Sequence, residues 1–80
     1  MTIAALGEKL AEMYARKGEN QSTMIHLFGV LYAGEIEASK ASAGEVVRAA
    51  GLPESYKTEV RKGMNLSKFV RLRDEYKGKF

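Results

Sequence analysis

The chain has 80 residues, of which 45% are hydrophobic and 29% are charged, and its formal net charge is +3. A chain of this length builds one small hydrophobic core and leaves little room for a second. The composition argues against intrinsic disorder, which goes with fewer apolar residues and a larger net charge. We therefore expect residues 1–80 to form a single domain.

The absence of cysteine excludes disulfides and thiolate metal sites. Small secreted domains usually depend on such cross-links, so the composition favours a cytoplasmic location. The first ten residues lack the basic and apolar segments of a signal peptide. The longest apolar run, residues 24–33, is too short to span a bilayer, and we expect no membrane partner.

Positive charge is concentrated in the second half of the chain. Residues 1–40 hold four Lys or Arg and five Glu, whereas residues 41–80 hold nine Lys or Arg and five Asp or Glu. Between Lys57 and Arg73 there are six basic residues and one acid, Glu59. A one-sided basic surface attracts phosphate groups, although it can also serve solubility alone.

Helical spacing is clear in residues 2–17, where apolar side chains recur on one face. Thr2 is expected to cap this helix, and Gly18 to end it. The residues of the apolar face are Ile3, Leu6, Leu10, Met13 and Tyr14.

Residues 21–39 allow two interpretations. Ser22 can cap a helix, and helical spacing then relates Ile25, Phe28, Tyr32 and Ile36. However, Gly29 and Gly34 each disfavour a helix by about 1 kcal/mol relative to Ala, and a short buried strand is the alternative for residues 24–33. We favour a helix because no second strand is visible to pair with it, and the glycines would allow close helix packing.

Short helices are expected in the remainder of the chain. Ser42 begins one with Glu45 at the spacing of a capping box, and Gly51 ends it. The next helix spans residues 53–62, with Pro53 in its first turn, and stops at Gly63. A fifth helix is expected to be capped by Asn65, with Leu66, Phe69 and Val70 packing inward.

We predict an all-α fold of four or five short helices around one core. Each predicted helix contributes apolar side chains to this core. The expected core residues are Ile3, Leu6, Leu10, Met13, Ile25, Phe28, Leu31, Tyr32, Val46, Val47, Leu52, Tyr56, Val60, Phe69 and Val70.

Two short helices joined by a glycine turn are a common arrangement for placing a helix in the major groove of DNA. The turn residue here is Gly51, and the apolar positions around it are Val46, Ala50, Leu52 and Val60. In these features residues 42–66 resemble the helix-turn-helix superfamily of DNA-binding proteins. The resemblance implies a recognition helix at about residues 54–62.

The sequence departs from that superfamily at two positions. A small residue usually stands four positions before the turn glycine, and Val47 stands there in this chain. An apolar residue usually stands six positions after it, where this chain has Lys57, with Tyr56 one place early. The turn or the second helix must therefore be shifted relative to the standard motif.

A helical wheel places polar side chains on the outer face of the predicted recognition helix, opposite Tyr56 and Val60. Cations bind phosphates, and Arg, Ser and Thr also contact base edges. The N-terminus of the expected fifth helix adds a second place for a phosphate. The predicted DNA-binding residues are Ser55, Lys57, Thr58, Arg61, Lys62, Lys68 and Arg71.

Other chemistry finds little support in the sequence. The only histidine, His26, lies in the apolar run, where it is more often a bonded structural residue than a catalyst or ligand. No zinc-binding spacing, phosphate-binding glycine loop or activated nucleophile is visible. We therefore expect no enzyme activity, catalytic residue, metal, cofactor or small-molecule substrate.

The sequence thus predicts a module that binds double-stranded DNA, with a role in transcription regulation. The alternative is a non-enzymatic interaction or adaptor domain within a larger system. Such a domain would dock an acidic partner or form a homodimer through its basic face or residues 24–36. The alternative differs from DNA binding in its expected salt dependence and in its lack of sequence preference.

Overall fold

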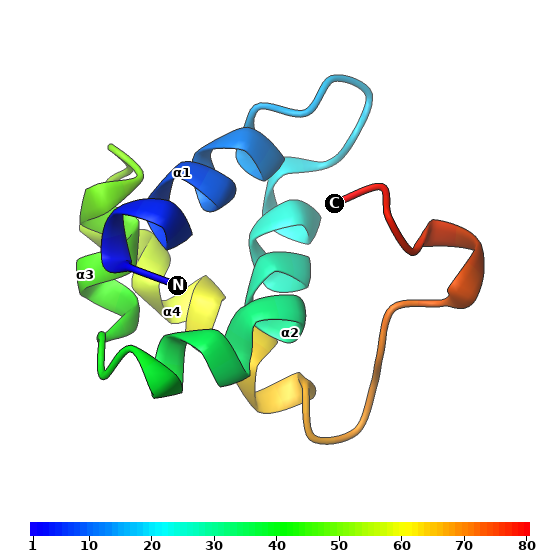
Figure 1. Cartoon of the computed structure of the whole chain (residues 1–80). Helices are drawn as coiled ribbons and strands as arrows, with labels where there is room; N and C mark the ends of the chain where they lie inside the picture. The colour runs from blue at the N-terminus through cyan, green and yellow to red at the C-terminus, as the bar shows by residue number, and fades with distance from the viewer.

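The computed structural model describes all 80 residues and contains helices but no strand (Figure 1). The expected all-α class is therefore confirmed, and residues 24–33 are helical. The helices are α1 (Ile3–Tyr14), α2 (Gln21–Ala38), α3 (Ala43–Ala49) and α4 (Lys57–Leu66). Two short 3-10 helices, η1 (Glu54–Tyr56) and η2 (Asp74–Tyr76), lie before α4 and near the C-terminus.

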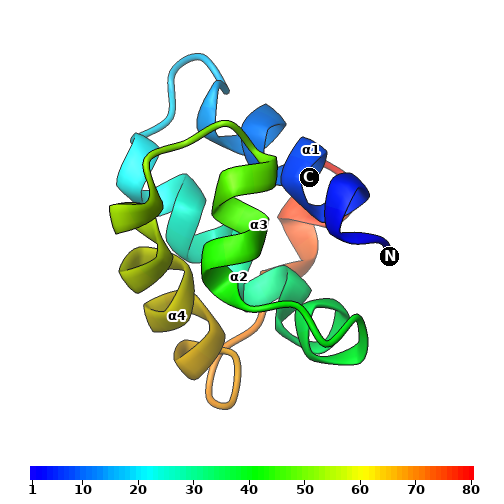
Figure 2. The same ribbon diagram turned by 90° about the vertical axis from the view of Figure 1, so that its left-hand side faces the viewer.

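Helix α2 is the centre of the fold. Helices α3 and α4 lie on one side of it, and the C-terminal segment, residues 70–80, lies on the other (Figures 1 and 2). Because α2 has neighbours on both sides, apolar residues occur around most of its circumference. The largest fully buried side chains are Leu6, Leu10, Ile25, Phe28, Ile36, Val46, Val47 and Val60.

Side-chain caps fix the start of three helices. The Thr2 hydroxyl accepts a hydrogen bond from the Ala5 amide at 3.0 Å. The capping box is complete, since Ser42 and Glu45 each accept a hydrogen bond from the other's backbone amide. The cap of α2 is Asn20 rather than the expected Ser22, because the Asn20 carboxamide accepts from the Thr23 amide at 2.9 Å.

Helices α2 and α4 approach each other through two glycines. A Cβ atom on Gly29 would lie 2.8 Å from the amide nitrogen of Met64, and a Cβ on Gly63 would lie 3.0 Å from the Cα of Gly29 and closer still to the carbonyl of His26. Side chains larger than hydrogen do not fit such a backbone contact. Two positions that disfavour a helix locally are therefore what allows these two helices to pack.

The expected boundaries at Gly63 and Asn65 are wrong. Gly63 does not end the fourth helix but is buried inside α4, and Asn65 lies within the same helix instead of capping a fifth. The expected start at Pro53 is also wrong, since η1 precedes α4. The close packing of Gly63 on α2 outweighs its cost in helix propensity, which is only about 1 kcal/mol.

The fifth helix does not form. After α4 the chain makes a turn, an extended stretch and η2. Phe69 is 83% exposed and Val70 47% exposed, so neither belongs to the core. The core gains Met24, Ile36 and Ala43, which the prediction omitted. The remaining predicted core positions are only partly buried, namely Ile3, Leu31, Tyr32, Leu52 and Tyr56.

Candidate nucleic-acid interface

The connection between α3 and α4 is built by a glycine in the left-handed region. Gly51 has φ +76°, which favours glycine. Its amide donates to the carbonyl of Arg48 at 3.0 Å, and the amide of Leu52 donates to the carbonyl of Val47 at 3.2 Å. This pair of bonds is a Schellman motif, which ends α3 and turns the chain sharply towards α4.

The 3-10 helix η1 explains the departure from the standard motif. It places an extra turn between Gly51 and α4, so that Lys57 is the first residue of α4. Tyr56 supplies the apolar contact instead. Its ring lies 5.7 Å from the ring of Tyr14, and the two hydroxyls are 3.3 Å apart. Of the two shifts that the sequence left open, the structure shows a later start of the second helix, after η1.

The exposed face of α4 is polar except at its last residue, Leu66, which is 45% exposed. Val60 and Gly63 are buried against the core, which turns Thr58, Arg61 and Lys62 outward. Ser55 is exposed in η1, and Lys68 is exposed in the turn after α4. Figure 2 shows α4 beside α3 on the side of the molecule away from the C-terminal segment.

Asn65 joins this outward face, which the sequence analysis missed. It is exposed, and it lies seven residues after Thr58 and four after Arg61, a spacing that returns to the same side of a helix. That spacing was visible in the sequence, but the expected stop at Gly63 hid it. An Asn carboxamide can pair with adenine through two hydrogen bonds in the major groove.

Glu54 links the two helices of the unit. Its carboxylate lies 3.1 Å from the Arg48 guanidinium of α3 and 3.5 Å from the Lys57 ammonium of α4. The charge of Arg48, followed by the hydrogen bond from Lys57, lowers the pKa of Glu54. Lys57 therefore shares its charge with a carboxylate and is less available to a phosphate than the sequence suggested.

Glu59 connects α4 to α2. Its carboxylate pairs with Nε2 of His26 and lies 3.2 Å from the ammonium of Lys62. The hydrogen bond with His26, and then that from Lys62, lowers the pKa of Glu59. His26 is thus a bonded residue at the boundary of the core, as expected. By contrast, Arg61 and Lys68 form no ion pair with a carboxylate.

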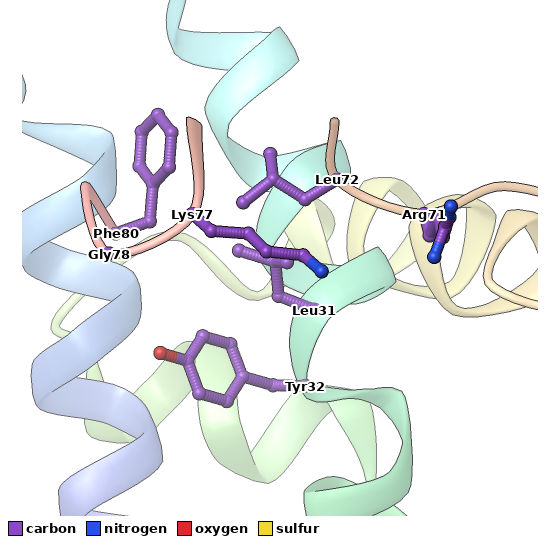
Figure 3. Close-up of a pocket in the computed structure, with 7 residues that line it drawn as sticks. All are labelled: Leu31, Tyr32, Arg71, Leu72, Lys77, Gly78 and Phe80. Carbon is purple, nitrogen blue, oxygen red and sulfur yellow. The ribbon is translucent and has the colours of Figure 1, made fainter. Parts of the chain in front are cut away.

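Arg71 lies apart from the helix on which it was expected. It belongs to the extended segment that crosses α2, at the edge of a cavity of about 450 Å³ (Figure 3). The side chains of Leu31, Leu72 and Lys77 surround the central part of this cavity, and Arg71 lies to one side of them. The structure therefore brings together six of the seven predicted residues in and around α4, and Arg71 follows on the adjoining segment.

The structure offers neither a metal site nor a membrane-spanning helix. No group of three or more His, Asp or Glu side chains is placed to hold a metal ion. No helix combines the length and the apolar character that crossing a bilayer requires. The site with the clearest chemical character is thus the polar and basic face of α4.

Comparison with known proteins extends the resemblance beyond residues 42–66. No curated protein and no solved structure matches this chain. A family described as the HTH-like domain matches residues 2–73, a range that includes all four α-helices. Helices α1 and α2 are therefore part of the family's domain, and the family's character suggests nucleic-acid binding. With most of its length matched in this way, the chain belongs to the HTH-like domain family.

Proposed function

We propose that this domain binds double-stranded DNA and that α4 enters the major groove. The observation that carries the proposal is the outward face of α4. The polar side chains of this face are all exposed to solvent, namely Thr58, Arg61, Lys62 and Asn65. An α-helix fits the major groove, and these side-chain types form hydrogen bonds with base edges there. Their shared face allows them to approach the bases together.

Phosphate contacts come from residues at the two ends of α4. Ser55 and Lys57 lie at its start, whereas Lys68 and Arg71 follow its end. Arg61 and Lys68 have no carboxylate to displace, so they are the cations best placed to contact DNA directly. Lys57 and Lys62 would contribute while remaining paired with Glu54 and Glu59, which fix their direction.

The proposal is tested by NMR titration of the labelled domain with a random-sequence duplex pool at about 50 and then 200 mM salt. Shifts are expected at residues 54–73 and should weaken with salt. Five phosphate contacts, from Lys57, Arg61, Lys62, Lys68 and Arg71, give a slope of about −4 to −5 in a plot of log affinity against log salt concentration. The absence of shifts at the lower salt concentration would overturn DNA binding.

Arg61→Ala is the most informative single substitution for this function. If Arg61 pairs with a guanine, its loss weakens binding to the preferred site by about 1–3 kcal/mol and relaxes the preference at one base pair. Selection from a random duplex library, followed by affinity measurements, provides the readout. Lys17→Ala is the matched control, because it removes one exposed cation from the loop between α1 and α2.

A second candidate function is a protein interaction through the outer side of α2. Met24, Ile25, Phe28 and Ile36 are buried in the core, so most of the apolar run is not available to a partner. A groove of about 380 Å³ between α2 and the C-terminal segment is nevertheless lined mainly by apolar side chains. Concentration-dependent dimerisation without DNA binding would favour this candidate.

A further inference from the structure

Phe69 is the most exposed large hydrophobic residue of the domain. It is 83% exposed, whereas the next, Met1, is 49% exposed. Single exposed apolar residues are common and need no explanation by themselves. The position of Phe69 directly after the proposed recognition helix is what makes it informative.

The turn that carries Phe69 continues the path of α4. The Ser67 amide donates to the carbonyl of Gly63 at 3.1 Å, and the Val70 amide donates to the carbonyl of Leu66 at 3.1 Å. These are hydrogen bonds between residues four apart, as in an α-helix. The Phe69 amide also bonds to Leu66, at 2.9 Å, so the backbone at this position is held in place.

Phe69 consequently extends the polar stripe of α4. Thr58, Lys62 and Asn65 follow one another at intervals of four and three residues on one face of α4, and Phe69 comes four residues after Asn65, in the turn that follows the helix. Val70, the next residue, turns the other way and lines the groove against α2. The aromatic ring therefore belongs to the proposed DNA-facing side and not to the apolar groove.

The surroundings of Phe69 favour a nucleic acid over a protein surface. No acidic residue occurs between Glu59 and Asp74, and the exposed Lys68 directly precedes the ring. The other members of the stripe are polar, whereas Leu66 and Val70, which are 45% and 47% exposed, lie beside the ring in the chain. An apolar ring among cations and hydrogen-bonding side chains suits the major groove of DNA, which combines phosphates, polar base edges and thymine methyl groups.

We propose that Phe69 is a specificity-determining residue that packs on the 5-methyl group of a thymine in the major groove. The thymine methyl is the apolar feature of that groove, and Phe is among the side chains that contact it. The inference rests on the proposed function, because it requires α4 to lie in the major groove. It adds a preference for an A·T pair at the end of the site nearest the C-terminus of α4.

The test replaces the thymines of the selected duplex by deoxyuridine, which removes the methyl groups and keeps the base pairing. Wild-type protein is expected to bind the thymine duplex about fourfold more tightly, as for one buried methyl group. Phe69→Ala should abolish this ratio, and Phe69→Leu should retain most of it. Tyr76→Ala is the control, because it removes another exposed aromatic side chain from the C-terminal segment.

Each outcome separates the two proposals. If wild-type protein binds neither duplex, the proposed function itself is wrong. If it binds and its thymine-to-uridine ratio equals that of Phe69→Ala, DNA binding stands and the assignment of Phe69 is overturned. The assignment is also overturned if Phe69→Ala removes self-association in sedimentation experiments while leaving the ratio unchanged, because the ring would then serve a second copy of the chain.

Discussion

The two sides of α2 are packed in different ways. Towards α4, backbone lies directly on backbone, because Gly29 and Gly63 present no side chain at the contact. Towards the C-terminal segment, contact is made by side chains, and two cavities of about 450 and 380 Å³ lie at that side. The position of α4 is therefore tightly fixed, whereas that of the C-terminal segment is not.

The C-terminal segment is held by a few separate contacts. Leu72 and Phe80 are half-buried, and the Arg16 guanidinium lies 4.4 Å from the centre of the Phe80 ring. The same guanidinium donates to the carbonyl of Lys79 at 2.6 Å. Because these contacts are exposed and few, we expect this segment to open at a lower free energy than the α2–α4 contact.

Gly63→Ala should cause the largest loss of stability. Its new methyl group would meet the backbone of His26 and Gly29, which cannot move away as a flexible side chain would. We expect the free energy of unfolding to fall by about 3 kcal/mol or more, the upper end of the cost of overpacking. Urea unfolding followed by circular dichroism measures this loss.

Gly34→Ala is the matched control for that substitution. Gly34 lies in the same helix as Gly29, but a Cβ atom there would meet no atom within 4 Å. Alanine should therefore stabilise the protein by about 0.5–1 kcal/mol through helix propensity alone. If both substitutions destabilised the domain equally, the proposed role of close glycine packing would be wrong.

Deletion of residues 74–80 should have a smaller effect than Gly63→Ala. It removes η2 and the half-buried ring of Phe80, and it exposes part of the outer side of α2. Partial burial of one aromatic side chain and its neighbours corresponds to about 1–2 kcal/mol. If the deletion caused a larger loss than Gly63→Ala in the same urea experiment, the C-terminal segment would be the more important of the two sides of α2 for stability.

Features set by neighbouring residues could be predicted from the sequence, whereas features set by contacts between distant residues could not. Where the signal is local, the prediction succeeded, as for the cap at Thr2, the capping box at Ser42 and the turn at Gly51. Gly63 was misread because its compensating partner, Gly29, lies far away along the chain. Propensity then indicated a helix end, and tertiary packing overrode it.

That one misreading affected the candidate site as well. Ending the helix at Gly63 made Asn65 a cap and assigned Phe69 to the core, although both are exposed. The orientation of Thr58, Arg61 and Lys62 was still predicted, because the burial of Val60 alone determines which side of the helix faces out. The pairing of Lys62 with Glu59 was not predicted at all.

Lowering the pH should weaken the packing of α4 on α2 through Glu59. The expected loss of stability is the smallest of the three. The hydrogen bonds from His26 and Lys62 lower the pKa of Glu59 from its ordinary value of 4.5, so ionised Glu59 stabilises the folded state above that pH. This contribution is lost as the pH falls below 4.5 through the lowered pKa. Urea unfolding at a series of pH values should therefore show a shallower acid-induced loss for Glu59→Gln than for wild type. Glu37→Gln, which removes an exposed carboxylate without an ion pair, should follow the wild-type curve; equal slopes for all three proteins would mean that the His26–Glu59 contact does not stabilise the packing of α4 on α2.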